Sequence, residues 1–165
     1  MIDSLLPNLF DLKLQALSEA VTRIFRALHH KDQVERIAIS KEGRTTLYSH
    51  DGTEINLPKS SGESQLFVLA LVGALAEVTG YRVPMIIDTP LARLSETHCQ
   101  NLLHYWTSDP ERQVILLAQD KEISAQDYVG LNGSVNKTYL LRHKQIRQGV
   151  GQSEAVENAY FGEMA

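Results

Sequence analysis

The chain has 165 residues, which is enough for one domain with a hydrophobic core and too few to predict two. Its composition, 43% hydrophobic and 22% charged, is typical of a soluble globular protein, and a net charge of −4 excludes a basic nucleic-acid clamp spread over the whole chain. The single cysteine, Cys99, excludes an internal disulfide framework. The acidic residues Asp3 and Asp11 do not suit a signal peptide, and no apolar run reaches the roughly 18–20 residues of a membrane span. We therefore expect a cytoplasmic protein that does not enter a membrane.

The first part of the chain predicts one long helix and a small antiparallel sheet. Apolar residues repeat every three or four positions over residues 9–30, which is the pattern of an amphipathic helix. His29 and His30, near its carboxyl end, are expected to be exposed. Three short extended segments follow, at residues 34–40, 45–49 and 53–57. The Asp51-Gly52 pair between the last two is a common hairpin signal, so antiparallel pairing is expected.

Helices and strands alternate from residue 62 onward. A long apolar helix is predicted over 62–79, with Gly80 as its C-cap. The pattern then predicts a strand at 83–88, a helix at 96–106, a strand at 112–118, a short helix at 121–127 and a strand at 137–142. The first two strands are continuous apolar runs, typical of parallel strands covered on both faces, and this order of elements is typical of an α/β fold. The tail from Gly149 is polar and predicted to be partly disordered.

The segment KSSGESQ, residues 59–65, stands directly before the long apolar helix and has two open interpretations. Ser60 and Glu63 match the capping box S-x-x-E, which satisfies backbone N–H groups at a helix start. Gly62 favours a second interpretation, because glycine in a first turn lowers helix propensity but lets a ligand approach the backbone. A helix N-terminus with free N–H groups and a flanking hydroxyl is a ready site for a phosphate.

Polar residues also follow the two apolar strands. Asp88 ends the first strand, and Gln119 and Asp120 follow the second. The carboxyl ends of parallel strands are where α/β sheets bind ligands, and a carboxylate at Asp88 could hold Mg²⁺ directly or through water. The alternatives are a strand-ending turn with an Asx hydrogen bond at Asp88 and an ordinary strand exit at Gln119.

Taken in order, these segments resemble the C-terminal half of an ABC-type ATPase. KSSGESQ resembles the signature motif, VPMIIDTP the Walker B strand, LARLS the D-loop and LLAQD the switch loop. The glutamate after the glycine is the SMC-like form of the signature, and the preceding helix and sheet resemble the point where the coiled-coil arm of SMC-like proteins enters this lobe. Within this class, IIDTPLARLS and SSGESQLFVLAL most resemble DndD, the ATPase of bacterial DNA phosphorothioation. The likeness extends from about residue 9 to residue 142.

The resemblance implies a fold and a division of the chain. The fold would be α/β, the C-terminal lobe of an ABC/SMC-type P-loop ATPase head, with a parallel sheet, flanking helices and a small antiparallel sheet. The whole chain, 1–165, would form a single domain. Its parts would be the end of a coiled-coil arm at 9–30, the antiparallel sheet at 34–57, the lobe with the motifs at 59–142 and a tail at 149–165.

The resemblance also implies roles for particular residues. The signature would bind, in trans, the ATP held by a second head protomer, through Ser60, Ser61, Gly62 and Glu63. Asp88 would bind Mg²⁺ through water. Thr89 and Gln119 would take the catalytic positions, and Leu94 and Ser95 belong to the D-loop.

Four positions depart from the family pattern, and the first is Lys59, where the signature usually begins with leucine. The other three lie in the later motifs. The usual catalytic glutamate is Thr89, the usual D-loop aspartate is Ser95, and the switch histidine is Gln119. Because the Thr89 hydroxyl cannot act as a carboxylate base, hydrolysis is expected to be slow.

The phosphate-wrapping motif G-x-x-x-x-G-K-[ST] does not occur in this chain. In SMC-like proteins it lies in an N-terminal segment before the coiled coil. The chain is therefore expected to be a fragment of a longer protein or half of a split ATPase, and to be inactive alone. The implied cofactors are ATP and Mg²⁺, and the implied partners are the N-terminal lobe, a second head protomer, DNA and other phosphorothioation proteins.

The remaining candidates are weaker. KTYLLRHKQIR, residues 137–147, is either a solvated strand end or a DNA contact through Lys137, Arg142, Lys144 and Arg147. His98 and Cys99 lack a partner at metal-ligand spacing, so packing or surface roles are expected. Two other functions stay open: a non-hydrolysing interaction module with a degenerate ABC-type fold, and another SMC-like DNA repair or defence ATPase.

Overall fold

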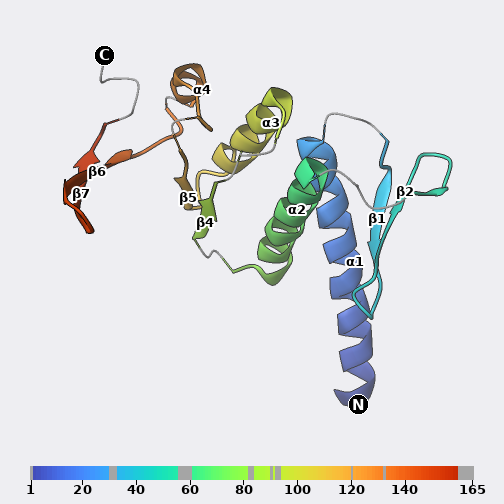
Figure 1. Cartoon of the computed structure of the whole chain (residues 1–165). Helices are drawn as coiled ribbons and strands as arrows, with labels where there is room; N and C mark the ends of the chain where they lie inside the picture. The colour runs from blue at the N-terminus through green and yellow to red at the C-terminus, as the bar shows by residue number, and fades with distance from the viewer. Residues whose placement is uncertain are drawn as a thin grey trace.

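A long helix, α1 (Ile2–Leu28), lies between the antiparallel sheet and the second helix, with the N-terminus at its far end (Figure 1). The computed structural model describes residues 2–29, 33–55, 61–81, 84–89, 91, 94–119, 121–131 and 133–159, with side chains described except at 2–7 and 125. The helix begins seven residues before the predicted start at residue 9, because the apolar spacing that marks a buried face appears only where α1 meets the rest of the chain. Its first described side chains are exposed.

A three-stranded antiparallel sheet packs against α1, in the order β1 (Arg36–Ile39), β2 (Thr45–Tyr48) and β3 (Glu54–Ile55). Ile37 pairs with Leu47 in register, and both side chains are buried against α1. The Asp51-Gly52 turn joins β2 and β3 as predicted, with Gly52 at φ 80°. Hydroxyl groups of α1 also bond the backbone of the edge strand β1: the Ile37 N–H donates to Thr22 Oγ1 (2.9 Å), and the Ile39 N–H donates to Ser18 Oγ (3.0 Å). Edge-strand groups that would otherwise need water are thereby tied to the helix.

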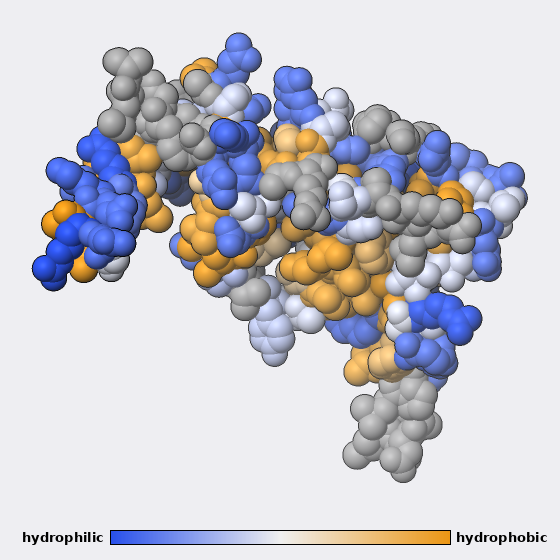
Figure 2. Space-filling model, viewed as in Figure 1, coloured by the Kyte–Doolittle hydropathy of each residue, from blue (hydrophilic) through white to orange (hydrophobic). Residues whose placement is uncertain are grey.

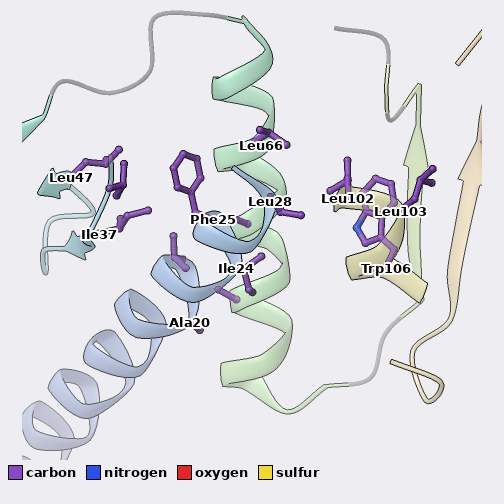
Figure 3. Packing of buried hydrophobic residues seen from close by; sticks show 14 of the residues in the cluster. Ala20, Ile24, Phe25, Leu28, Ile37, Leu47, Leu66, Leu102, Leu103 and Trp106 are labelled. Atoms are coloured by element: carbon purple, nitrogen blue, oxygen red, sulfur yellow. The ribbon is translucent and has the colours of Figure 1, made fainter. Parts of the chain in front are cut away.

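The core forms where α2 (Ser61–Thr79) packs on the carboxyl half of α1. The buried positions of α2 include the small residues Ala70, Gly73 and Ala74, which allow the two helices to approach closely. A Cβ at Gly73 would lie 2.7 Å from the Tyr105 hydroxyl and 3.3 Å from Ile24 Cδ1, so no larger residue fits there without movement. Figure 3 shows the resulting cluster, in which side chains of both helices meet those of the antiparallel sheet and of α3: Ile24, Phe25, Leu28, Ile37, Leu47, Leu66, Leu102, Leu103 and Trp106.

By length and composition alone, α2 is the one helix in the described part of the chain that could cross a membrane. One such helix is weak evidence for a membrane span, because core helices of soluble proteins pass the same test. The α2 helix contributes Leu66, Ala70, Gly73 and Ala74 to the core, although 22% of its 18-residue apolar stretch is buried. One stripe of α2 nevertheless remains exposed, at Val68, Val72 and Leu75. Figure 2 shows apolar residues gathered on the surface over α2.

A two-stranded parallel sheet follows, formed by β4 (Met85–Asp88) and β5 (Val114–Leu117). The crossover between them is α3 (Glu96–Thr107), which buries Leu102, Leu103 and Trp106 against the core. One face of this sheet is exposed: Ile86 is 66% exposed, and Ile115 and Leu117 are also open to solvent. The expectation of strands covered on both faces is therefore wrong within this chain, because α3 and the core cover only one face.

The last elements are a short helix, α4 (Ala125–Gly130), and an antiparallel hairpin of β6 (Tyr139–Arg147) and β7 (Val150–Glu157). The hairpin projects away from the helical core (Figure 1). Two predictions are corrected here. The short helix begins at 125 rather than 121, because residues 121–123 form a turn before the Ser124 N-cap. The described part of the tail, 149–159, is mostly a strand, because Gly149 lies in the turn that returns the chain onto β6.

Leu66 provides a test of the core. Its side chain is fully buried, so Leu66→Ala should lower the free energy of unfolding by about 2–5 kcal/mol, measured by chemical denaturation. Val68→Ala, two residues along the same helix at a site 54% exposed, is the matched control and should change it by less than about 0.5 kcal/mol. Equal losses in the two variants would contradict the packing of α2 described above.

The hairpin turn between β2 and β3 provides a second test. The Ser49 hydroxyl and the Thr53 backbone N–H donate to the Asp51 carboxylate, and they lower its pKa from 3.8 to about 2. The ionised form is thus favoured in the folded turn, so its stabilisation is present above pH 3.8 and is lost as the pH falls through about 2. NMR titration of the Asp51 carboxyl carbon should give a midpoint near 2, and Ser49→Ala should raise it toward 3.8. A wild-type midpoint at the ordinary value would show that these bonds do not form.

Candidate functional site

The carboxyl ends of β4 and β5 bring the Walker B and switch-loop candidates to one edge of the parallel sheet. Asp88, the last residue of β4, pairs in register with Leu117, the last residue of β5. The next N–H, of Thr89, donates to the Leu117 carbonyl at 2.9 Å. Gln119 follows two residues later with an exposed side chain, and Asp88 is exposed as well. Asp120 lies outside the described residues.

Thr89 adopts an unusual backbone conformation, with φ at 46°. A β-branched residue in this left-handed region is a genuine outlier and costs on the order of 1–3 kcal/mol. The surrounding contacts must hold it there, and such strain clusters at ligand-binding and catalytic sites. Thr89, directly after Asp88, is the position at which the resemblance to ABC-type ATPases predicts a catalytic residue.

Glu122 joins the two loops that leave this edge, and the sequence analysis did not identify it. Its Oε2 accepts from the Gln119 N–H (2.9 Å), and its Oε1 accepts from the Leu91 N–H (3.2 Å). Leu91 lies three residues after Asp88, and its side chain is buried in the core. The only sequence signal is an acid three residues after the polar end of a strand, a spacing too common to single out a residue.

The signature segment lies at the start of α2. Ser61, Gly62 and Glu63 lie in its first turn, at the end of the helix that carries a partial positive charge. Ser60 lies outside the described residues, so neither the capping box nor a Ser60 contact is tested. The Glu63 carboxylate instead faces the end of α1, with its Oε1 3.4 Å from His29 Nε2.

A column of two buried histidines links the signature segment to the D-loop. The His29 ring, 9% exposed, stacks on His98 with centroids 5.6 Å apart. His98 Nδ1 lies 3.1 Å from Ser95 Oγ, just before α3 begins. The expectation that His29 is exposed is therefore wrong, because His29, at the end of α1, packs beside the first turn of α2. His30 lies outside the described residues. The column spans Glu63, His29, His98 and Ser95, and Leu94 next to it packs on the core.

The metal candidates are sparse. Within the described ranges, no three His, Cys, Asp or Glu side chains lie close enough to hold an ion. Burial raises the pKa of the Cys99 thiol, with Asp127 adding to the effect, so Cys99 is poorly suited as a thiolate ligand. The lone exposed carboxylate of Asp88 fits Mg²⁺ held through water, since this ion keeps several waters and takes few protein carboxylates.

A groove of about 680 Å³ lies elsewhere, between α1 and β1. Three arginines line it, but each is already engaged: Arg23 pairs with Glu77, Arg26 pairs with Glu35 (3.2 Å), and the Arg36 guanidinium lies 4.1 Å from the centre of the Tyr48 ring. We therefore assign no anion site to this groove, whose lining does not include the polar strand ends.

The basic candidates lie along the β6–β7 hairpin. Lys137 bonds Glu157, which raises the pKa of its ammonium, and Arg142 lies 4.0 Å from Glu154 on the opposite strand. Lys144 and Arg147 are exposed further along β6. Because two of the four charges are offset within the hairpin, its net positive field is smaller than the sequence suggests.

The histidine column predicts a cost for removing His98. His98→Ala should lower the free energy of unfolding by about 2–4 kcal/mol, because it removes a buried ring together with its contacts to His29 and Ser95. His104→Ala, at an exposed site on the same helix, should change it by less than about 0.5 kcal/mol in the same denaturation measurement. A negligible loss at His98 would contradict the column.

No family model matches the sequence, and no curated protein matches it. Solved structures do match. One, from work on ATP-driven dimerisation and DNA-stimulated activation of SMC ATPases, aligns over 90% of this chain and 88% of its own, with a TM-score of 0.63 and 18% identity. The SMC head domain of Pyrococcus yayanosii, with a coiled coil and joint, aligns over 94% of this chain and 29% of its own, with a TM-score of 0.67 and 16% identity.

The Pyrococcus furiosus SMC head, with an extended coiled coil and bound to the C-terminal domain of ScpA, aligns over 90% of this chain and 36% of its own, with a TM-score of 0.62 and 18% identity. The chain thus spans most of the first structure and about a third of each of the other two. At this identity the likeness shows the fold, and it confirms the predicted one: the chain has the α/β architecture of an ABC/SMC-type ATPase head lobe.

Proposed function

We propose that this chain is the C-terminal lobe of an SMC-like ATPase head and completes a composite ATP site between two heads. The observation that carries the proposal is the sheet edge where Asp88, Thr89 and Gln119 meet, within the fold of an SMC head. ABC-type signature, Walker B and switch-loop motifs in this order, on this fold, have no simpler explanation. The solved structure connected with ATP-driven dimerisation supports a second head as partner.

In this proposal, residues of the chain contribute to two nucleotide sites, one in their own head and one in the partner head. Asp88 would hold Mg²⁺ through water at the site of its own head, and the ion would offset the charge of the phosphates there. The signature segment, with Ser60, Ser61, Gly62 and Glu63, would meet the γ-phosphate bound by the partner head, because the N-terminus of a helix and nearby hydroxyls favour an anion. Thr89 and Gln119 would orient water with neutral groups, so turnover would be slow and binding would dominate.

The chain has exposed apolar surface to which the proposed N-terminal lobe could bind. The exposed face of the parallel sheet, at Ile86, Ile115 and Leu117, and the apolar stripe of α2 lie on a chain that lacks the phosphate-wrapping motif. Apolar faces of this kind on a soluble protein mark interaction sites. A lobe that carries G-x-x-x-x-G-K-[ST] would supply the missing phosphate contacts and cover apolar surface at the same time.

We also propose the wider setting of the protein. The α1 helix would continue into a coiled-coil arm, and the whole ATPase would act on DNA in the cytoplasm. DNA phosphorothioation is the pathway we favour, on the strength of the IIDTPLARLS and SSGESQLFVLAL segments, with other phosphorothioation proteins as partners. Another DNA repair or defence ATPase of the same class would use the same site. Lys144 and Arg147 are the hairpin residues best suited to a DNA contact.

A second candidate function is a non-hydrolysing interaction module. Thr89, Ser95 and Gln119 favour it, because each replaces a charged or imidazole group that family members use in hydrolysis. Such a module would keep the fold and the apolar faces but would be indifferent to nucleotide.

Calorimetry with ATP and Mg²⁺ tests the proposal, on this chain alone and mixed with a separately produced N-terminal lobe. We expect nucleotide binding only in the mixture. In the mixture, Asp88→Asn should lower ATP turnover by roughly tenfold to a hundredfold, because the ion loses the carboxylate that orients its water. Ser60→Arg should lower turnover by blocking the signature with a bulky side chain.

Glu54→Gln, which removes one exposed carboxylate from the antiparallel sheet, is the charge-matched control and should leave turnover unchanged. Failure of the mixture to bind nucleotide would overturn the ATPase proposal in favour of the interaction module. ATP turnover that is insensitive to Asp88→Asn would argue against the assigned site.

A further inference from the structure

The Glu122 carboxylate is the one side-chain group among the described contacts that touches both loops leaving the sheet edge. Each of its oxygens accepts a backbone N–H, from Leu91 in the loop after β4 and from Gln119 in the loop after β5. Among the residues that the structure describes at this edge, the two β-strands are also joined by their ladder and by the Thr89–Leu117 bond. We call this pair of hydrogen bonds the Glu122 bracket.

We propose that Glu122 is a positioning residue of the nucleotide site, which holds the segment after Asp88 and the switch residue Gln119 at a set separation. The inference rests on the proposed function and adds to it a residue that the family motifs do not name. Glu122 does not touch the nucleotide in this scheme. It acts through the backbone of the residues that would.

The bracket is anchored at both ends. Leu91 and Ile123, the neighbour of Glu122, are both buried in the core cluster, so the donor and the acceptor are fixed to the same body. The Glu122 N–H also donates to the Gln119 carbonyl (3.0 Å), which closes a tight turn and aims the side chain back at the loops. An anchored carboxylate loses little freedom when it makes its bonds, and bonds to a charged acceptor are about twice as strong as neutral ones.

The bracket also explains how Thr89 keeps its strained conformation. Thr89 lies between the ladder bond at its own N–H and the bonded N–H of Leu91 two residues later. Backbone held on both sides of a residue can maintain a φ of 46° that the isolated segment would relax. Loss of the hydrogen bond from the Leu91 N–H to Glu122 therefore lets the backbone at Thr89 relax, directly after the proposed magnesium ligand Asp88.

Glutamate is the side chain that this geometry requires. Glutamine keeps the size and one acceptor oxygen, but its NH₂ cannot accept a backbone N–H, so one arm of the bracket is lost without creating a cavity. Aspartate is one methylene shorter and cannot reach both donors. Glu122→Gln is therefore the informative variant, with Glu54→Gln as the control that makes the same chemical change on the antiparallel sheet.

The first measurement uses this chain alone. Amide hydrogen exchange followed by NMR should show the Leu91 or the Gln119 amide exchanging at least roughly tenfold faster in Glu122→Gln than in wild type, while buried α2 amides stay within about twofold. Glu54→Gln should leave all of them unchanged. Unchanged exchange at both amides in Glu122→Gln would overturn the bracket, whatever the chain does with nucleotide.

The second measurement adds the N-terminal lobe. Glu122→Gln should lower kcat by roughly tenfold and leave the nucleotide Kd within about twofold, because a positioning defect affects the reacting geometry more than binding. Faster amide exchange with an unaltered kcat, or equal losses in kcat and affinity, would overturn the positioning role. Absence of nucleotide binding by the wild-type mixture would overturn the proposed function instead, and the exchange result would still decide the bracket.

Discussion

The close packing of α2 on α1 is the contact on which the rest of this structure depends. It is possible because Ala70, Gly73 and Ala74 give α2 a shallow face, into which side chains of α1 such as Ile24 fit. That approach fixes where both helices end. The first turn of α2 comes to lie beside His29, the residue that follows α1, and the buried His29 ring stacks in turn on His98 of α3. The core thus helps to position the proposed phosphate-binding turn.

The second constraint is the parallel pairing of β4 with β5. Two parallel strands both start at one edge of the sheet, so a crossover helix must bring the chain back from the end of β4 to the edge where β4 began. The carboxyl ends of β4 and β5 therefore lie together at the opposite edge. Two short strands form a weak frame by themselves. The Glu122 carboxylate and the buried side chains on either side of it reinforce that frame where the loops diverge.

Several surfaces of the chain expose apolar side chains to solvent. The stripe of α2, one face of the parallel sheet and the outer face of the β6–β7 hairpin all expose large apolar side chains, including Val68, Ile86 and Leu141. On a chain of −4 net charge these faces would favour association over an isolated existence. They agree with an ATPase lobe whose chemistry is completed by another polypeptide segment and by a second head.

The sequence by itself determined the order of the elements and the chemical character of their ends. Local signals suffice for this: apolar spacing for α1, a long apolar run for α2, the Asp51-Gly52 turn for β2 and β3, and polar residues such as Asp88 after apolar runs. The motifs also identified the fold, which the solved SMC heads bear out. Tertiary structure alone decided the burial of His29, the strand after Gly149 and the exposed face of β4 at Ile86. It also decided the strained φ of Thr89 and the hydrogen bond between the Gln119 N–H and Glu122. Each of these depends on which distant segment lies opposite a residue, and no pattern of neighbours along the chain contains that information.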